Sequence, residues 1–408
     1  MTGKSDPRGA LDGLVVLDLS RILAGPTCTQ LLGDLGATVW KIENPATGGD
    51  DTRQWGPPFA PLADGTDSDL SAYFMCANRN KRSVTADLAR SDDRAMIAAL
   101  AARADVVIEN FKPGGLVPYG LDHATLCARH PGLIYCSISG FGQTGPNRDK
   151  PGYDLMAQGF GGIMSLTGAP DGPPMKVGVG IADVMCGMYA TIGILAALRH
   201  RDATGEGQHI DLALVDAQMA WTINEGVNYL TSGQLPQRRG NAHPNIVPYD
   251  VFACADGHVI VAVGNDGQFR RFCDFLGRPG LADDPRFATN PARLTHREML
   301  LADLRPALAV LPMQAVIAGL EARKVPVGPV NTLDLALGSD QAEARGAVIE
   351  MDGPGGALRL LGNPLKLSAT PVRYDRPPPR CGQDTDALRR FLDPAPKPDA
   401  EGAPEESA

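Results

Sequence analysis

The sequence of 408 residues lacks the patterns that mark several large classes of protein. Its eight cysteines form no C-x-x-C pair and its seven histidines form no H-E-x-x-H motif, so no metal site is expected. The scattered cysteines are expected to be buried free thiols. No uninterrupted run of about 18 apolar residues occurs, which argues against a membrane-spanning helix.

Positive charge is also scarce. Lys and Arg together number 38 against 47 Asp and Glu, a net charge of -9, so a large basic surface for nucleic acid is not expected. Residues 1–13 are polar and lack the apolar core of a signal peptide, so we expect a cytoplasmic protein with no membrane partner. The end of the chain, residues 393–408, is rich in proline and acidic side chains and is expected to be disordered.

What the sequence does contain is an alternation of short apolar runs and helical segments. Residues 14–19 are predicted to form a buried strand, 27–36 a helix and 37–43 the next strand, a β-α-β unit that indicates a parallel sheet. A helix at 91–104 and strands at 105–110, 133–139 and 209–215 continue the pattern. The sequence therefore predicts a large α/β domain around an open, doubly wound, mostly parallel Rossmann-like sheet.

The pattern of predicted strands and helices changes after about residue 235. Helices are predicted from Asp183 to about His200 and over 216–235. Residues 244–264 then form two strands joined by an Ala-Asp-Gly turn, followed by a helix that Asp266 is expected to cap. We predict a small α+β domain at 236–330 and a large domain made of 1–235 and 331–392.

The stretch KVGVGIADVM, residues 176–185, allows three interpretations of one aspartate. Gly178 and Gly180 begin a G-x-G-x-x-G loop, but Asp183 replaces the third glycine and its charge would repel a pyrophosphate. As a structural residue, Asp183 would cap the following helix. As a functional residue, it would be kept ionised by the helix start and would attack an acyl carbon without a general base, with backbone N–H groups nearby to hold the oxyanion.

Three other stretches accompany it: LDLSRILAGPTCTQLLGDLG at 17–36, ENFKPG at 109–114 and PGYDLM at 151–156. With them, from about residue 11 to 392, the chain resembles the class III CoA-transferases, which include formyl-CoA, carnitine-CoA and succinyl-CoA:dicarboxylate transferases. The resemblance implies that Asp183 is the nucleophile. It further implies CoA-binding roles for Leu23, Ala24, Asp87, Leu88, Asn110, Phe111, Lys112, Tyr153 and Asp154.

The chain departs from the family pattern at two places. Leu23 stands where many members have glutamine, and Pro118 falls where some have a basic residue after the ENFKPG turn. The charge that neutralises the CoA phosphates is therefore expected from Lys112, Arg79, Lys81 or Arg82. The alternative for the basic run at 78–82 is a solvated surface.

Similar proteins also include α-methylacyl-CoA racemases, which need an acid–base group on each side of the substrate α-carbon. Tyr153 stands where they have histidine, and a phenol is a poor base at neutral pH. Transfer is therefore favoured over racemisation. A CoA-binding protein without activity is the third alternative.

The loop RRGNAHP at 238–244 resembles the corresponding loop of the succinyl-CoA:dicarboxylate transferases. The resemblance implies that Gly240, Asn241 and His243 bind a substrate carboxylate, while the alternative for His243 is a solvated loop residue. Arg238 and Arg239, which precede them, are expected to attract a dicarboxylate by bidentate pairing. The hypothesis is CoA transfer from an acyl-CoA, with succinyl-CoA as donor, to a short dicarboxylic acid through an aspartyl-CoA thioester. CoA and acyl-CoA are then substrates, no cofactor is permanently bound, and an interlocked homodimer is implied.

Overall fold

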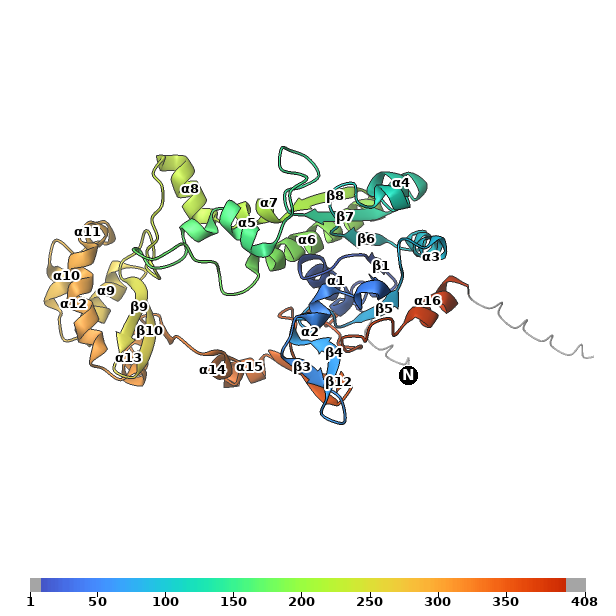
Figure 1. The fold of residues 1–408 in the computed structure, drawn as a ribbon. Coiled ribbons are helices and arrows are strands. Elements are labelled where there is room, and N and C mark those ends of the chain that lie inside the picture. Colours follow the sequence, from blue (N-terminus) through green and yellow to red (C-terminus); the bar gives the residue numbers. More distant parts are fainter. Residues whose placement is uncertain (1–8, 394–408) are drawn as a thin grey trace, which may run out of the picture. The chain divides into compact units, whose positions relative to one another are not determined.

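The computed structural model describes residues 9–393, which form two compact units. The larger unit contains residues 9–163, 177–227 and 346–393, and the smaller contains 164–176 and 228–345. Residues 1–8 and 394–408, which include nearly all of the tail predicted to be disordered, lie outside the described part of the chain. Figure 1 follows the chain through both units.

The larger unit is organised around a six-stranded sheet in which all neighbouring strands are parallel. The strand order is β5-β2-β1-β6-β7-β8, so the chain builds outward from β1 to one edge and then from β6 to the other. This is the order of doubly wound sheets, and it confirms the predicted α/β architecture with a parallel sheet. The strands are β1 (Val15–Asp18), β2 (Thr38–Glu43), β5 (Lys81–Thr85), β6 (Val106–Glu109), β7 (Ile134–Ser139) and β8 (His209–Ala213).

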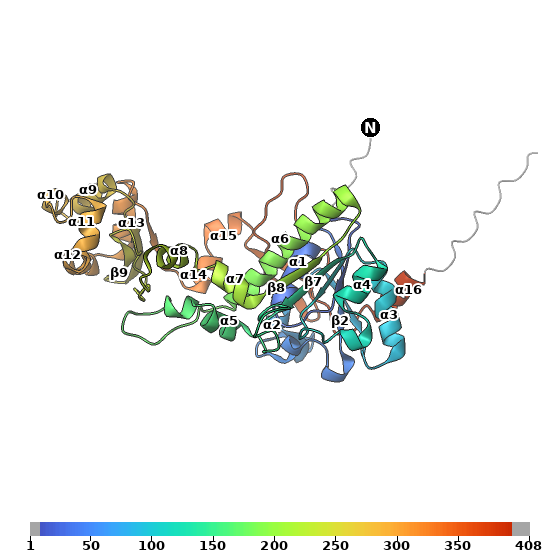
Figure 2. The same cartoon turned by 90° about the horizontal axis from the view of Figure 1, so that it is seen from above.

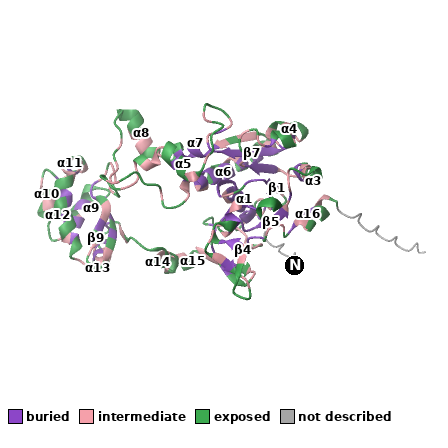
Figure 3. Ribbon diagram, viewed as in Figure 1, coloured by how far each residue is buried: buried purple, intermediate pink, exposed green. Residues whose placement is uncertain are grey.

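Both faces of this sheet are covered, which explains why the central strands β1, β6 and β7 are mainly apolar and buried. Val16 and Val106 pack into one core and their neighbours Leu17 and Val107 into another, because successive side chains of a strand point to opposite faces. Figure 3 shows the buried residues concentrated in these strands. The first core includes residues of α1 (Ala24–Asp34), α6 (Ile181–Thr204) and α7 (Leu214–Ala220); the second includes residues of α3 (Ser91–Ala101), α4 (His123–Arg129) and α16 (Thr385–Leu392).

The longest helix, α6, runs along one face of the sheet over β7 and β8 (Figure 2). Within residues 9–393 it is the one continuous helix long and apolar enough to cross a membrane, with a mean hydropathy of 1.8 over its most apolar window. A core helix passes the same test, and 56% of that window is buried inside the protein. The helices α12 (Arg297–Ala309) and α13 (Met313–Glu321) pass this test only as a pair, and they are bent by 114° relative to each other.

The smaller unit contains a three-stranded antiparallel sheet surrounded by helices. Its strands are β9 (Tyr249–Cys254), β10 (Gly257–Ala262) and β11 (Val327–Pro329). Its helices are α9 (Asp266–Phe275), α10 (Gly280–Asp283), α11 (Asn290–Thr295), α12 (Arg297–Ala309), α13 (Met313–Glu321), α14 (Leu333–Leu337) and α15 (Asp340–Ala344). The helix α8 (Ile223–Ser232) spans the boundary between the units. The larger unit also contains β3 (Phe59–Pro61), β4 (Asp67–Ser71), α2 (Ala72–Met75), α5 (Asp154–Phe160), β12 (Val348–Gly353) and β13 (Gly356–Leu361).

Several local features differ from the sequence predictions. The smaller unit is wider than the predicted 236–330, because the Gly240 N–H donates to the Gly168 carbonyl oxygen and Arg238 donates to those of Ala169 and Gly172. These bonds join residues 164–176 to a segment about 70 positions away, which no local pattern reveals. The single helix predicted over 216–235 is divided into α7 and α8. The cap of α9 is Asn265, whose side chain accepts the Gln268 N–H, and not Asp266.

Candidate active site

The loops after β1 and β6 meet where the strand order reverses. Asn110, directly after β6, accepts the Arg21 N–H at 2.9 Å and donates to the Arg21 carbonyl oxygen at 2.7 Å. Adjacent parallel strands whose chains leave in opposite directions create a crevice at their carboxyl ends. A ligand site is therefore expected between these two loops.

A pocket of about 450 Å³ lies at this place in the larger unit. Seven of the residues singled out from the sequence border it: Leu23, Ala24, Asn110, Phe111, Lys112, Tyr153 and Asp183. A second pocket of about 340 Å³ adjoins it, since Arg21, Phe111 and Gly115 border both, and Asp87 and Leu88 border this second pocket. The tertiary structure thus brings together nine predicted positions that are spread over 160 residues of sequence.

Asp183 lies in the first turn of α6 and is only 8% exposed. One interpretation of the sequence made Asp183 the cap of this helix, and that interpretation is wrong. The N-cap residue is Gly180, and it is the Asp154 carboxylate that accepts the N–H groups of Ala182 at 2.8 Å and Asp183 at 3.4 Å. The next N–H, from Val184, donates to the Gly180 carbonyl oxygen. The N–H groups expected to hold an oxyanion are therefore already engaged.

The carboxyl group of Asp183 has an unusual acidity. Burial, and after it the negative charge of Asp154, raises the pKa of Asp183 to about 7. The prediction of a carboxylate fully ionised at neutral pH is thus corrected: protonated and ionised forms are comparably populated there. The position of Asp183 at a helix start can be predicted from the sequence, but the burial that raises its pKa cannot.

Tyr153 and Asp154, which were predicted to act as a pair beside the thioester, have different surroundings in the structure. Tyr153 is the N-cap residue of α5, is 60% exposed and borders the larger pocket. Asp154 does not border that pocket; one of its oxygens binds the start of α6 and the other accepts a hydrogen bond from Gln158 at 2.6 Å. Asp154 therefore acts on Asp183 by position and charge.

The cations of the basic run at 78–82 do not border either of these two pockets. Arg79 and Lys81 are buried, and they form ion pairs with Asp34 at 2.6 Å and Asp18 at 3.3 Å. The Arg82 guanidinium lies 5.2 Å from the centre of the Trp40 ring and borders a different pocket. Of the four candidates for binding the CoA phosphates, Lys112 alone borders the larger pocket.

Several residues that border this pocket were not singled out from the sequence, among them Arg21, Trp55 and Lys150. Arg21 could have been found, because it follows β1 at the carboxyl edge of the sheet, and it pairs with Asp51 at 2.8 Å. Trp55 and Lys150 lie in loops without a recognisable motif.

The predicted carboxylate-binding residues Arg239, Gly240, Asn241 and His243 lie in the smaller unit. The loop is stabilised by hydrogen bonds from the Asn245 N–H to His243 Nδ1 and from the Arg297 guanidinium to the His243 carbonyl oxygen. His243 also stacks edge-on against Tyr249. The His243 side chain therefore contacts Asn245 and Tyr249 and is not surrounded by solvent alone.

Over residues 9–393, no group of three or more His, Cys, Asp or Glu side chains is arranged to hold a metal ion. The eight cysteines are free thiols, as predicted, but only Cys28, Cys136, Cys186 and Cys273 are buried. Cys76 is exposed, which corrects the expectation that all are buried.

A doubly wound sheet with a crevice at its switch point and a buried carboxyl group beside that crevice defines an α/β enzyme of the nucleotide-binding type. The chain belongs to CoA-transferase family III, whose model matches residues 11–385. The family resemblance inferred from the motifs is thereby confirmed, and the protein is a CoA-transferase acting on CoA thioesters.

Relatives named as CoA-transferases match along nearly the whole chain. A succinate–glutarate CoA-transferase of Agrobacterium fabrum is 48% identical over 384 residues, covering 94% of this chain and 96% of the relative. A succinyl-CoA:mesaconate CoA-transferase of Haloarcula hispanica is 41% identical, covering 89% and 91%. The human succinyl-CoA:glutarate CoA-transferase is 38% identical, covering 92% and 84%.

Solved structures agree with this assignment. A CAIB/BAIF family protein from Brucella suis has a TM-score of 0.85 and 47% identity, covering 95% of this chain and 100% of that one. A protein from M. tuberculosis has a TM-score of 0.82 at 28% identity, covering 94% and 99%.

Proposed function

We propose that this protein transfers CoA from succinyl-CoA to a short dicarboxylic acid and that Asp183 carries the CoA as a thioester. The observation that carries the proposal is the Asp183 carboxyl group, which is buried yet borders a pocket at the switch point of the sheet. The choice of substrates is supported by the relatives, whose names pair succinate or succinyl-CoA with glutarate or mesaconate. A 39% identical relative from Acetobacter aceti is named acetyl-CoA:oxalate CoA-transferase, so the donor varies among similar sequences.

The proposed first half-reaction begins with attack of the Asp183 carboxylate on the thioester carbonyl of the donor. The C–S bond breaks, giving a mixed anhydride and a CoA thiolate. The thiolate then attacks the aspartyl carbonyl, which forms the enzyme thioester and releases the donor as a free carboxylate. The acceptor carboxylate repeats these steps in reverse order, so no proton is gained or lost overall.

Burial of Asp183 serves this chemistry in two ways. A carboxylate with few water contacts is a better nucleophile, and the thioester formed on it is shielded from hydrolysis. The raised pKa also makes Asp183 a poorer leaving group than an ordinary carboxylate when the anhydride is attacked. The low exposure therefore favours transfer between acids over loss of the acyl group to water.

Roles in binding follow from the two adjoining pockets. Leu23, Ala24, Asn110, Phe111 and Tyr153 are proposed to contact the thioester end of CoA, and Asp87 and Leu88 its nucleotide. Lys112 is proposed to pair with the phosphates, together with Arg21 and Lys150, which border the same pocket. The acceptor-binding roles of Arg239, Gly240, Asn241 and His243 rest on the resemblance of their loop.

The proposal includes an interlocked homodimer in the cytoplasm. Exposed apolar side chains on α5 and α6 support a contact with a second copy of the chain: Leu155, Met156, Phe160, Met188 and Ile192. Light scattering coupled to size-exclusion chromatography tests this, and a monomer at micromolar concentration contradicts it.

Intact-mass spectrometry after an acid quench tests the covalent step. On mixing with succinyl-CoA, the protein should gain the mass of one CoA minus water, and peptide mapping should place it on Asp183. The Asp183→Ala variant should gain nothing, whereas Asp202→Ala, on an exposed part of the same helix, should react like the natural protein. An adduct that survives in Asp183→Ala contradicts the proposal.

The alternatives give different results in companion assays. A racemase exchanges the α-proton of a 2-methylacyl-CoA with deuterated water in the absence of any acceptor acid. A protein that only binds CoA takes up the thioester without passing CoA to labelled glutarate or mesaconate. Transfer to these acids with no exchange supports the proposed activity.

A further inference from the structure

The wall of the larger pocket contains a residue in an unfavourable backbone conformation. Ile22 borders the pocket and has a φ of 72°, in the left-handed region. A β-branched side chain is rarely found there, because its Cβ crowds the following carbonyl group. Such strain persists only where surrounding contacts enforce it, and it often occurs at functional sites.

The contact that enforces it comes from a buried ion pair. Both Asp50 carboxylate oxygens lie 3.3 Å from the Ile22 nitrogen and accept its N–H. Lys41 Nζ donates to Asp50 at 2.8 Å and to the Ser20 carbonyl oxygen at 2.9 Å. The side chains of Lys41 and Asp50 are both completely buried, so one pair binds the loop on both sides of Arg21.

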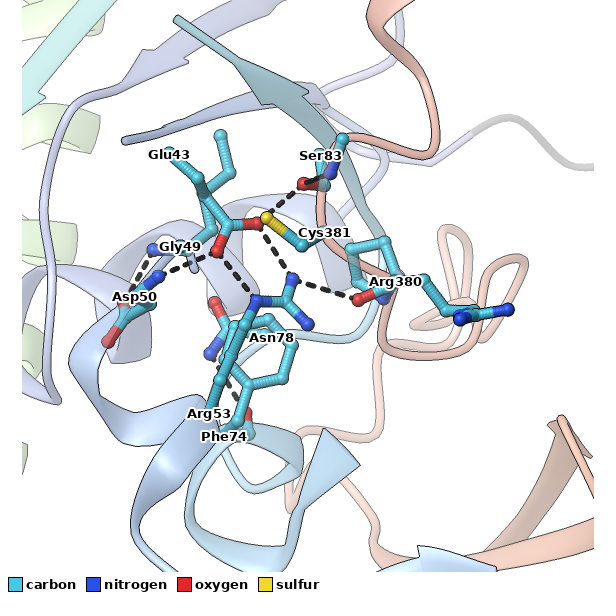
Figure 4. A network of polar contacts seen from close by, with 12 residues as sticks. Glu43, Gly49, Asp50, Arg53, Phe74, Asn78, Ser83, Arg380 and Cys381 are labelled. Atoms are coloured by element: carbon cyan, nitrogen blue, oxygen red, sulfur yellow. Dashed lines mark hydrogen bonds and ion pairs between the residues drawn. The ribbon is translucent and has the colours of Figure 1, made fainter. Parts of the chain in front are cut away.

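Asp50 is itself held by a second tier of contacts, drawn in Figure 4. The Glu43 carboxylate accepts the Asp50 N–H at 2.8 Å and two hydrogen bonds of 2.7 Å from Arg53. Gly49 is required beside it, since its φ is 100° and an added Cβ would lie 2.5 Å from a Glu43 oxygen. The position of Asp50 is therefore fixed independently of the loop that it binds.

The loop connects directly to the start of α6. A Cβ added at Gly180, the N-cap residue of α6, would meet Leu23 Cδ2 at 3.1 Å, so Leu23 packs against the turn that leads to Asp183. A change in the path of residues 20–23 thus alters both the pocket wall and the packing beside Asp183. Burying two charges is costly, and apolar replacements of such pairs are often no less stable, so stability alone is a weak reason for the pair.

We propose that Lys41 and Asp50 are positioning residues for CoA transfer: they hold Ile22 in its left-handed conformation and thereby keep residues 20–23 in place beside Asp183. The inference rests on the proposed function in one respect, namely that the transfer uses this pocket and Asp183. A purely structural role for the pair predicts lower stability without a specific effect on the reaction.

The experiment measures single-turnover formation of the Asp183 thioester at saturating succinyl-CoA, together with the melting temperature. Asp50→Asn should slow thioester formation by tenfold or more. The matched control is Asp34→Asn, which breaks another buried ion pair, with Arg79, but does not border either pocket. It should lower the melting temperature and leave the rate per folded molecule within twofold.

The decisive variant changes the strained residue itself. Glycine adopts a φ of 72° without penalty, so the loop of Ile22→Gly needs less support. Adding Asp50→Asn to the Ile22→Gly variant should therefore lower the rate of thioester formation by threefold or less. In the natural protein the same substitution should lower this rate by tenfold or more. If Asp50→Asn does not fold, Lys41→Met/Asp50→Asn replaces it in both backgrounds, since this double variant leaves no lone buried charge.

The outcomes separate the two hypotheses. If the natural protein forms no Asp183 thioester, the proposed function fails. If it forms the thioester but Asp50→Asn reacts as fast as Asp34→Asn, or if the effects of Asp50→Asn and Ile22→Gly simply multiply, the proposed function stands and the positioning role is rejected.

Discussion

Asp154 and Asp183 share the start of α6, where Asp154 accepts the backbone N–H of Asp183 at 3.4 Å and that of Ala182 at 2.8 Å. One carboxylate therefore stabilises the helix start, and the other borders the pocket. From the sequence, Asp183 is a candidate both for capping the helix and for a functional carboxylate. In the structure, Asp154 binds the helix start and Asp183 borders the pocket. The closeness of their charges also adjusts the acidity of Asp183.

The first prediction concerns the pH dependence of the reaction. The pKa of Asp183 is raised to about 7, and in the proposed mechanism only its ionised form attacks the thioester. In the free enzyme, kcat/KM for succinyl-CoA should therefore rise about tenfold per pH unit below 7 and level off above it. Initial rates between pH 5.5 and 8.5 test this; a flat profile over that range contradicts it.

The second prediction separates the two causes of that pKa. Asp154→Asn keeps an oxygen that can accept the Ala182 N–H but removes the negative charge that helps to raise the pKa of Asp183. The midpoint of the kcat/KM profile should move to lower pH, so the ratio of rates at pH 6 and pH 8 increases. The larger cause, burial, remains, and the midpoint should stay above the value of an ordinary aspartate. A midpoint that does not move, or moves upward, would show that Asp154 does not act through its charge.

The third prediction concerns stability. Because the pKa of Asp183 is higher in the folded state than the usual 3.8, the folded state binds this proton more tightly. The associated stability is present below about pH 4 and is lost as pH rises to about 7. Asp183→Asn, which carries no charge, should be more stable than the natural protein at pH 8, by about 2–4 kcal/mol, and the difference should shrink at pH 5. Melting temperatures without CoA test this, and a difference independent of pH rules it out.

The fourth prediction compares two glycines of α6. An added Cβ at Gly187 would lie 2.5 Å from the Ala24 carbonyl oxygen, whereas one at Gly193 would meet only Ile210, at 3.6 Å. Gly193→Ala should stabilise the protein by about 0.5–1 kcal/mol through helix propensity. Gly187→Ala should destabilise it by about 1–3 kcal/mol through overpacking, and should slow thioester formation because α1 begins at the pocket. Equal melting temperatures for the two variants would contradict the close α1–α6 contact.

Much of the parallel sheet could be predicted because its signal is local. Apolar runs at 14–19, 37–43, 105–110 and 133–139 became β1, β2, β6 and β7 within one or two residues. The helix predicted from Asp183 starts only two residues earlier, at Ile181. The helix over 216–235 was less well predicted, because the break between α7 and α8 has no glycine or proline to mark it.

The sequence by itself determined the alternation of strands and helices, the family, and several of the residues that border the pocket, among them Asn110, Phe111 and Asp183. The sequence did not predict which charged side chains are buried in ion pairs. Lys81 and Arg79 were interpreted as available cations, but both are enclosed with aspartates from distant segments. Only the tertiary structure decided which carboxyl group caps α6, which acidic side chain loses its water, and which buried pair holds Ile22. Hydrogen bonding, desolvation and charge pairing depend on groups brought together from across the chain, so no single stretch of sequence specifies them.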